Sequence, residues 1–241
     1  MIGNIDTLLR GNPYPGRGII LGRSEDGAQA VLVYFIMGRS ENSRNRVFER
    51  TDDGIRTKAF DPAKMSDPSL VIYHPVRVIE GRTIVSNGDQ TDTIFGHLAG
   101  GQDFRSALLT REFEPDPPIY TPRISGLISR DGSYKLSILK SAEGNPDCCC
   151  RFFFEYSAPV PGIGHFISTY ESDGAPPPSF TGEPVPVGIE AADGLEQFAG
   201  TVWDSLNDDN KVSLYAREVF IATGESRDVI INKNCNCSGP P

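Results

Sequence analysis

The chain has 241 residues and a formal net charge of −9 at pH 7, with 38% hydrophobic and 23% charged residues. This composition is typical of a globular protein long enough to bury a substantial core, and no apolar run approaches the roughly 20 residues of a membrane-spanning helix. The acidic balance argues against non-specific binding to DNA or RNA, which requires a basic face. The first residues, MIGNIDTLLRGNPYPG, lack the basic and apolar regions of a signal peptide, so we expect a cytoplasmic protein.

The first part of the chain is predicted to consist of strands, because short apolar runs alternate with turn residues. Strands are expected around Ile19–Leu21, within 27–38, after the Asp53-Gly54 turn, and on both sides of the Glu80-Gly81 turn. The run within 27–38 is continuously apolar, which is typical of a strand buried on both faces. The strand after Asp53-Gly54 is expected at a sheet edge.

Helical spacing appears over 92–111, with a break at Gly100-Gly101 and with Thr91 or Asp92 as the expected N-cap. The clearest hairpin lies within 123–141 and turns at Asp131-Gly132.

The rest of the chain is predicted to contain two strands around a Pro/Gly turn within 150–172, an amphipathic helix over 194–206, and a closing strand pair. The proline-rich segment 174–188 cannot form a helix or a central strand. The fold class is therefore α+β, with two mainly antiparallel sheets face to face and helices outside. We expect one domain over 1–233 and a flexible tail over 234–241.

The five cysteines form two short clusters, CCC at 148–150 and the pair Cys235 and Cys237. An odd number of cysteines without a signal peptide indicates reduced thiols. A structural zinc site usually leaves two to four residues between paired ligands, and neither cluster does so. We therefore expect free, catalytically dispensable thiols and no metal.

The segment MGRSENSRNR (37–46) follows an apolar strand and is unusually basic for this acidic chain. It carries three arginines against one carboxylate, with neutral donors between them: Arg39, Ser40, Asn42, Arg44, Asn45 and Arg46. Guanidinium groups match phosphate oxygens in pairs, so the segment indicates a site for a phosphorylated metabolite. The alternative is a solvated loop beside an edge strand.

A second polar group lies in SNGDQTDTI (86–94), where Asn87, Asp89, Thr91 and Asp92 crowd a turn before a predicted helix. Two neighbouring carboxylates can share a proton or bind a cation. The alternative is a helix cap with a turn-forming Asn-Gly pair, and the spacing is not that of an EF-hand.

Further candidates follow along the chain: Tyr120 and Arg123 at the start of a strand, His165 and Tyr170 in GHFISTY, and Glu183 in FTGEP. His165 is a candidate general acid or base, although a single histidine is more often structural. The sequence contains no nucleophile elbow, P-loop or dinucleotide-binding fingerprint.

Taken together, GRGIILG, YFIMGRSENSRNR, SNGDQTDTI, YTPRISG, GHFISTY and FTGEP resemble the archaeal-type IMP cyclohydrolase family and its bacterial IMP cyclohydrolase-like relatives. The resemblance covers about Asn12 to Lys233. It implies a four-layer αββα fold of the N-terminal-nucleophile-hydrolase type and closure of the purine ring in the last step of IMP synthesis. The chain starts Met1-Ile2-Gly3, so we expect neither the N-terminal nucleophile nor a covalent intermediate.

The substrate that this resemblance implies is 5-formamidoimidazole-4-carboxamide ribotide, whose carboxamide nitrogen attacks its own formyl group with loss of water. Because the reaction is intramolecular, the enzyme mainly holds two groups in register, and no cofactor is needed. We assign substrate binding to a set dominated by the phosphate candidates: Arg39, Ser40, Asn42, Arg44, Asn45, Arg46, Thr91, Asp92 and Tyr170. The catalytic candidates are Asn87 and Asp89 for the carboxamide, Tyr120 and Arg123 for carbonyl oxygens, and His165 or Glu183 for proton transfer.

The expected partner is thus a small purine nucleotide, with no nucleic acid and no membrane, and we expect a homo-oligomer. Two alternatives remain. The chain could bind a purine nucleotide without turnover, or it could be an amide hydrolase on the same fold.

Overall fold

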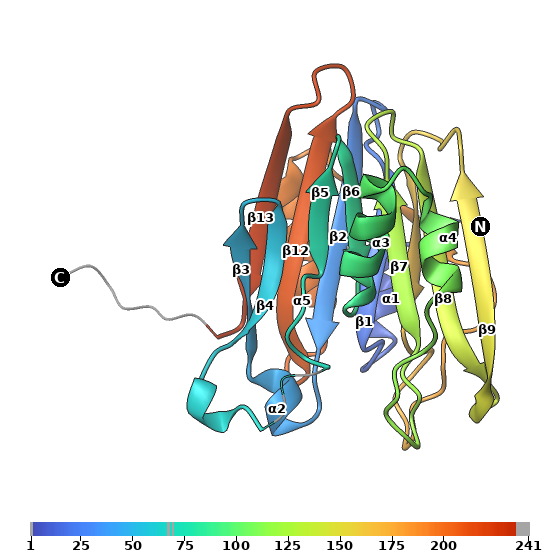
Figure 1. Cartoon of the computed structure of the whole chain (residues 1–241). Coiled ribbons are helices and arrows are strands. Elements are labelled where there is room, and N and C mark those ends of the chain that lie inside the picture. Colours follow the sequence, from blue (N-terminus) through green and yellow to red (C-terminus); the bar gives the residue numbers. More distant parts are fainter. Residues whose placement is uncertain (1, 67, 69, 235–241) are drawn as a thin grey trace.

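Two β-sheets packed face to face form the body of the protein (Figure 1). The computed structural model describes residues 2–66, 68 and 70–234. In this part of the chain, neighbouring strands within each of the two sheets are all antiparallel. The α+β class with two mainly antiparallel sheets, predicted from the sequence, is therefore confirmed.

The six-stranded sheet has the order β11-β10-β1-β2-β12-β13. Its strands are β1 (Arg17–Arg23), β2 (Gln29–Met37), β10 (Ile163–Ser168), β11 (Val185–Gly188), β12 (Lys211–Phe220) and β13 (Ser226–Asn232). β2 lies inside this sheet and is buried on both faces, as its apolar sequence predicts. Leu32 and Tyr34 face the other sheet, whereas Val31 and Val33 face a layer of helices.

The seven-stranded sheet has the chain order β3 to β9. Its strands are β3 (Arg46–Thr51), β4 (Gly54–Ala59), β5 (Val76–Ile79), β6 (Arg82–Ser86), β7 (Arg123–Ile128), β8 (Tyr134–Ala142) and β9 (Asn145–Tyr156). The predicted edge strand after Asp53-Gly54 is wrong, because β4 lies between β3 and β5 and β3 forms the edge. The charged residues of β3 hide its strand character from a pattern based on apolar runs.

Helices cover the outer faces of both sheets. They are α1 (Ile5–Arg10), α3 (Gln90–Ala99), α4 (Phe104–Leu109) and α5 (Leu195–Ser205), while α2 (Glu41–Arg44) and a 3-10 turn (Pro62–Lys64) lie in connections. α1 and α5 pack on the six-stranded sheet, and α3 and α4 pack on the seven-stranded sheet. The helices predicted over 92–111 and 194–206 are thus confirmed, including the break at Gly100-Gly101.

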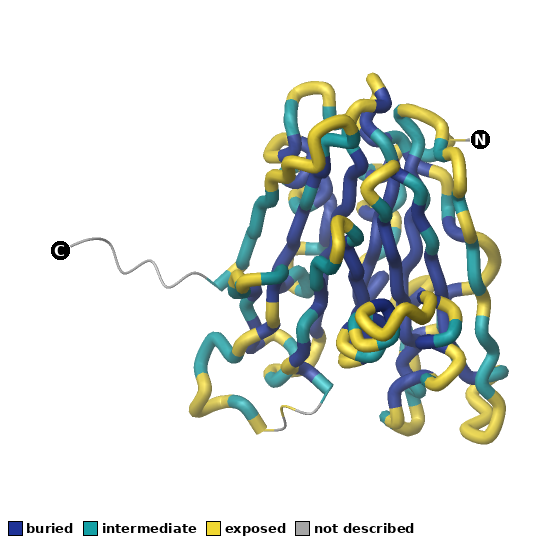
Figure 2. The backbone as a smooth tube through the Cα atoms, turned by 45° about the horizontal axis from the view of Figure 1, so that its top comes forward, coloured by how far each residue is buried: buried dark blue, intermediate teal, exposed yellow. Residues whose placement is uncertain are grey.

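The core is continuous between the sheets and thins out toward their ends (Figure 2). At one end, the start of β1, the end of β2 and the short α2 meet the loops that precede β7 and follow β10. The middle of the sandwich is closely packed with apolar side chains, so polar side chains can gather only near such an end.

Cys148, Cys149 and Cys150 are free thiols in β9, as predicted. Cys235 and Cys237, and the predicted tail apart from Asn234, lie outside the described residues. Within 2–66, 68 and 70–234, no helix has the length and apolarity needed to cross a membrane, and no group of three metal-binding side chains comes together.

The helix layer over the six-stranded sheet depends on Phe198, which is 1% exposed, whereas a Cβ added to Gly200 on the same helix would meet nothing within 4 Å. We expect Phe198→Ala to lower the free energy of unfolding by about 3–5 kcal/mol. Gly200→Ala should raise it by about 0.5–1 kcal/mol, because alanine restricts the unfolded chain and favours helix. Urea unfolding followed by circular dichroism measures both. Equal effects of the two substitutions would contradict this packing.

Candidate functional site

A cavity of about 320 Å³ opens at the end of the sandwich where α2 lies. Its lining comes from the start of β1, from α2 and from connecting loops of both sheets: Tyr14, Arg17, Arg39, Ser40, Asn42, Ser43, Leu70, Val71, Glu114, Asp116, Ile119, Thr121 and Tyr170. Of the residues predicted from the sequence, this cavity brings together Arg39, Ser40, Asn42 and Tyr170.

Arg39 and the turn that follows it form the rim of this cavity. Ser40 caps α2, since its Oγ accepts a hydrogen bond from the Ser43 amide at 3.1 Å, and the Ser43 hydroxyl accepts one from the Ser40 amide at 3.0 Å. Arg39 donates to Asp173 Oδ1 at 2.5 Å and to the Gly174 carbonyl at 2.7 Å, and its guanidinium lies 4.6 Å from the centre of the Tyr14 ring. The Arg39–Asp173 pair is partly exposed, so an anion that enters the cavity can compete for this arginine.

Arg44 and Arg46 face different surroundings from Arg39. Arg44 donates to the Gly38 carbonyl at 2.9 Å and to Asn210 Oδ1 at 3.0 Å, which ties the end of β2 to the loop before β12. Arg46 is fully buried and donates from Nε to the Ser43 carbonyl at 2.7 Å. Its Nη1 has no hydrogen-bond partner among the described residues. The predicted arginine cluster is thus divided between the cavity rim, a loop anchor and a buried position behind the cavity.

Arg17 and Glu114 form the charged interior of the cavity and were missed in the sequence. Arg17 is the first residue of β1 and is 8% exposed, and its Nε is buried without a partner in the described part of the chain. Although burial alone would lower the pKa of Arg17, the nearby Glu114 carboxyl raises it, so Arg17 stays charged. Burial raises the pKa of Glu114 to about 7, against the opposing effect of Arg17 and Arg123. A carboxyl that titrates near neutral pH can both accept and donate a proton.

Hydroxyl groups lie both in the cavity wall, on Thr121 and Tyr170, and in the buried layer behind it. The Tyr34 and Tyr73 hydroxyls lie 2.9 Å apart in the buried layer behind Arg17, and burial raises the pKa of Tyr34. The Tyr170 hydroxyl lies 3.0 Å from Thr121 Oγ1, which donates to Asp116 Oδ2 at 2.5 Å. These contacts fix the loop before β7 against the loop after β10.

The predicted pair Asn87 and Asp89 belongs to a polar network beside the cavity, in which Asn87 is buried and Asp89 is exposed. Asn87 Oδ1 accepts from the Ile124 amide at 2.8 Å and from Gln90 Nε2 at 3.0 Å. Arg123 Nη1 donates to Asp89 Oδ1 and Gln90 Oε1, each at 2.6 Å. This network joins the start of α3 to β7 and holds Arg123 next to Glu114.

Asp89 and Asp92, the two neighbouring carboxylates of segment 86–94, do not share a proton. Burial disfavours ionisation of Asp89, but hydrogen bonds and charge from Arg111 and Arg123 outweigh burial and lower its pKa. Asp92 pairs with Arg77 at 3.0 Å. The N-cap predicted at Thr91 or Asp92 is also wrong, because α3 begins at Gln90 and Asp89 occupies the cap position.

Gly88 leaves space for the Arg123 and Gln90 side chains of this network. A Cβ there would lie 2.5 Å from Arg123 Nη1 and 2.7 Å from Gln90 Oε1. The Thr91 hydroxyl lies within the same turn, 2.5 Å from the Ser86 hydroxyl. Thr91 therefore stabilises the turn rather than lining the cavity.

Other predicted residues are not among those that line the cavity. Asn45 exchanges two hydrogen bonds with the backbone of Asp61, at 2.7 and 2.8 Å. The Tyr120 ring packs edge-on against Phe113, 5.5 Å between centres. His165 Nδ1 lies 2.6 Å from the Tyr134 hydroxyl.

His165 is also separated from the charged interior along the sheet. It lies opposite Leu21, four residues along β1 from Arg17, which corresponds to about 13 Å. Its ring stacks on Tyr156, 4.0 Å between centres, and burial lowers its pKa. Glu183 is exposed and its charge acts on the same Tyr156. His165 and Glu183 thus belong to a neighbouring aromatic cluster.

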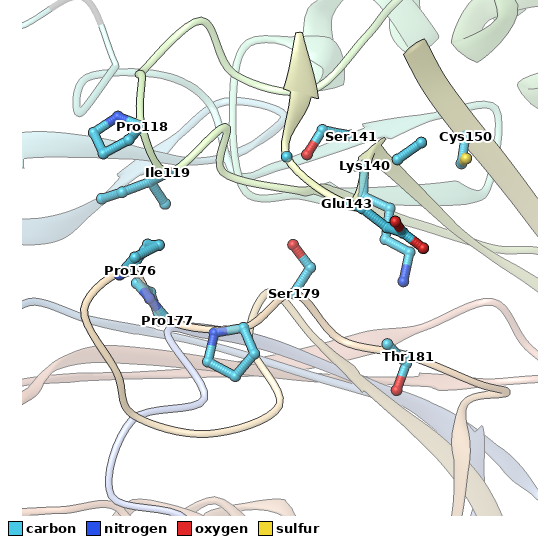
Figure 3. A pocket seen from close by; sticks show the side chains of 13 residues that line it. Pro118, Ile119, Lys140, Ser141, Glu143, Cys150, Pro176, Pro177, Ser179 and Thr181 are labelled. Carbon is cyan, nitrogen blue, oxygen red and sulfur yellow. The ribbon is translucent and has the colours of Figure 1, made fainter.

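A larger cavity of about 590 Å³ shares Ile119 with the first one (Figure 3). Pro118, Ile119 and Ser141 face Pro176 and Ser179 across it. Its single lining lysine, Lys140, already donates to the Phe180 carbonyl at 2.7 Å. We place the candidate functional site in the smaller cavity because it combines buried charges, the Arg17 Nε that has no partner among the described residues, and a carboxyl whose pKa is about 7.

The pKa of Glu114 gives a prediction for stability. Between about pH 4.5 and 7 the folded protein keeps a proton that the unfolded chain releases, so the free energy of unfolding falls as pH rises through this window. Because the substituted side chain does not titrate, Glu114→Gln removes this fall in the free energy of unfolding. We expect its stability relative to wild type to increase by on the order of 3 kcal/mol between pH 4 and pH 8. Urea unfolding at both pH values measures this, with the exposed Glu112→Gln as a control that should show little change.

Residues 14–224 match a family described as IMP cyclohydrolase-like protein. A protein named IMP cyclohydrolase from Methanosphaera stadtmanae is 30% identical over 162 residues, which cover 66% of this chain and 74% of that protein. A protein of the same name from Methanopyrus kandleri is 29% identical over 160 residues, 65% of this chain and 75% of that protein. The family match includes every residue that lines the candidate cavity. The chain belongs to the IMP cyclohydrolase-like family.

Proposed function

We propose that this chain is a cytoplasmic IMP cyclohydrolase that closes 5-formamidoimidazole-4-carboxamide ribotide to IMP with loss of water, in purine biosynthesis. The observation that carries the proposal is the buried Glu114 beside Arg17 in a cavity whose rim presents Arg39 and Ser40. The family membership and the names of the archaeal relatives support the same reaction.

The rim is suited to the 5′-phosphate of the substrate. Arg39 supplies a charged donor, and Ser40 and Ser43 supply hydroxyls next to it. A phosphate at this position would replace Asp173 as the acceptor of the Arg39 hydrogen bond. The phosphate role predicted for Arg44 and Arg46 passes mainly to Arg39, because Arg44 is engaged with Gly38 and Asn210.

The interior is suited to the two reacting groups. The carboxamide nitrogen adds to the formyl carbon, and the negative charge that develops on the formyl oxygen would be stabilised by the unpaired Nε of Arg17. Ionised Glu114 would take the proton that leaves the carboxamide nitrogen and return it to this oxygen. In the second step the formamido nitrogen loses its proton and the former formyl oxygen leaves as water, with Glu114 again relaying the proton.

The order of layers, helices on either side of two stacked sheets, supports the four-layer sandwich of the N-terminal-nucleophile-hydrolase type. In our proposal the reaction uses no N-terminal nucleophile. Gly3 pairs with Val187 on the β11 edge of the six-stranded sheet, and the reacting groups are instead side chains of β1 and of the loop before β7.

Turnover can be followed by the ultraviolet absorbance of IMP after addition of the formylated substrate. We expect wild-type kcat/KM to rise with pH through an inflection near pH 7, because Glu114 must be ionised to accept the first proton. Glu114→Gln should lose at least about a hundredfold in kcat, the usual contribution of a general base, and should lose this inflection. Binding of IMP without any turnover by wild type would instead favour a nucleotide-binding protein.

The rim gives an independent prediction for binding. Arg39→Ala should weaken IMP binding about ten- to a hundredfold, since a hydrogen bond involving a charged group contributes roughly 1.5–3 kcal/mol. Calorimetry measures the affinity, and the dephosphorylated nucleoside should bind wild type and variant about equally. Arg56→Ala, which removes an exposed arginine paired with Glu49, is the matched control. An unchanged affinity in Arg39→Ala would place the phosphate elsewhere.

A further inference from the structure

A second group of arginines lies at the opposite end of the sandwich from the candidate site. There the β5–β6 hairpin of one sheet lies near the β12–β13 hairpin of the other (Figure 1). A cavity of about 190 Å³ opens between them. Its lining consists of Val78, Gly81, Thr83, Arg130, Arg217, Val219, Thr223 and Gly224. Neither the sequence motifs nor the proposed reaction accounts for this cavity.

Arg130 lies against one glycine of each hairpin, Gly81 and Gly224. Its stem passes over Gly81, where an added Cβ would lie 3.7 Å from the arginine Cβ and Cδ. Its guanidinium lies against Gly224, where an added Cβ would come within 3.1 Å of Nε, and Nη2 donates to the Thr223 carbonyl at 3.2 Å. Both glycines have positive φ, 74° and 79°, in their turns. The backbone of both hairpins therefore approaches this side chain closely.

Arg217 reaches the cavity from β12. Its Nη2 donates to Ser226 Oγ at 2.8 Å, while its Nε is buried and has no hydrogen-bond partner among the described residues. A buried guanidinium donor without a partner is unfavourable, so an acceptor that enters the cavity gains from meeting it.

The charge of the cavity is positive. Its lining contains two arginines, two threonines and no carboxylate among the described residues. Three carboxylates of the same two hairpins pair with other arginines: Glu80 with Arg82, Asp228 with Arg50, and Glu218 with Arg227. Glu225, in the β12–β13 turn, does not line the cavity. The volume is below that of ordinary pockets for whole small molecules, about 300–1,000 Å³, and suits a compact group.

We propose that this cavity binds a tetrahedral oxyanion, a phosphate group held by Arg130 and Arg217. Guanidinium groups match phosphate oxygens, and Thr83 and Thr223 also line the cavity. The group is either free phosphate or the terminal phosphate of a larger molecule whose remainder lies outside. The site is separate from the candidate active site, since Arg217 lies six residues along β12 from the α2 end, about 20 Å. The proposal does not depend on the proposed reaction.

Calorimetry with inorganic phosphate tests the site, with chloride at equal ionic strength as the blank. The titration uses the full chain carrying Arg39→Ala, which weakens the phosphate position at the other end. We expect one phosphate to bind still. Adding Arg130→Gln or Arg217→Gln should weaken it about ten- to a hundredfold. Arg82→Gln removes an equal charge from the same β5–β6 hairpin outside the cavity and should leave the affinity unchanged.

Arg130 is an exposed turn residue, so its replacement should preserve the fold, which circular dichroism verifies. Loss of phosphate binding in Arg39→Ala alone, or unchanged binding in Arg130→Gln, would overturn the proposal. Competition by IMP identifies the phosphate of a larger molecule as the ligand group, and its absence identifies free phosphate. Either result, combined with the Arg130 dependence, supports the site.

Discussion

The burial of Glu114 among arginines is the constraint on which the arrangement of this end of the molecule depends. Removing a carboxyl group from water disfavours its charged form, and here three arginines, Arg17, Arg46 and Arg123, only partly offset that effect, so the pKa of Glu114 remains near 7. Such a balance persists only if the surrounding groups cannot move to solvate the carboxyl. The Asn87–Gln90–Arg123 network provides that rigidity on one side, and the contacts of Thr121 with Asp116 and Tyr170 provide it on another.

Much of the fold could be predicted from the sequence because its signals are local. The apolar run of β2, the Asp131-Gly132 turn and the stripe of α5 each specify their element without reference to distant residues. β3 was not placed at its edge, since Arg46, Glu49 and Arg50 interrupt any apolar pattern. The pairing of β9 with one sheet and β10 with the other is set by packing across the sandwich, which no short pattern encodes.

The charged interior was less predictable for the same reason. Arg17 is the first residue of a glycine-rich strand, and Glu114 lies between charged residues of a loop, so neither stands out locally. Their proximity arises only when β1 and the loop before β7 come together at one end of the sandwich. The arginine segment was visible, yet its members have different roles because strand register decides them. Arg46 lies two residues before Phe48 in β3, so both side chains point to the same face of the strand. Because Phe48 packs between the sheets, Arg46 is buried there as well.

Charged side chains lie between the sheets at both ends of the sandwich. The middle of the layer between the sheets is filled by apolar side chains, so a charged group can lie between the sheets only near an end, where loops supply partners. At the α2 end, the arginines meet Glu114 and Asp116, which makes the site suitable for moving protons as well as holding an anion. At the β12–β13 end, Arg130 and Arg217 line a cavity that includes no carboxylate among the described residues, so only anion binding fits it. In our two proposals, the difference between the reactive site and the anion-binding site thus depends on a single buried carboxyl group, that of Glu114.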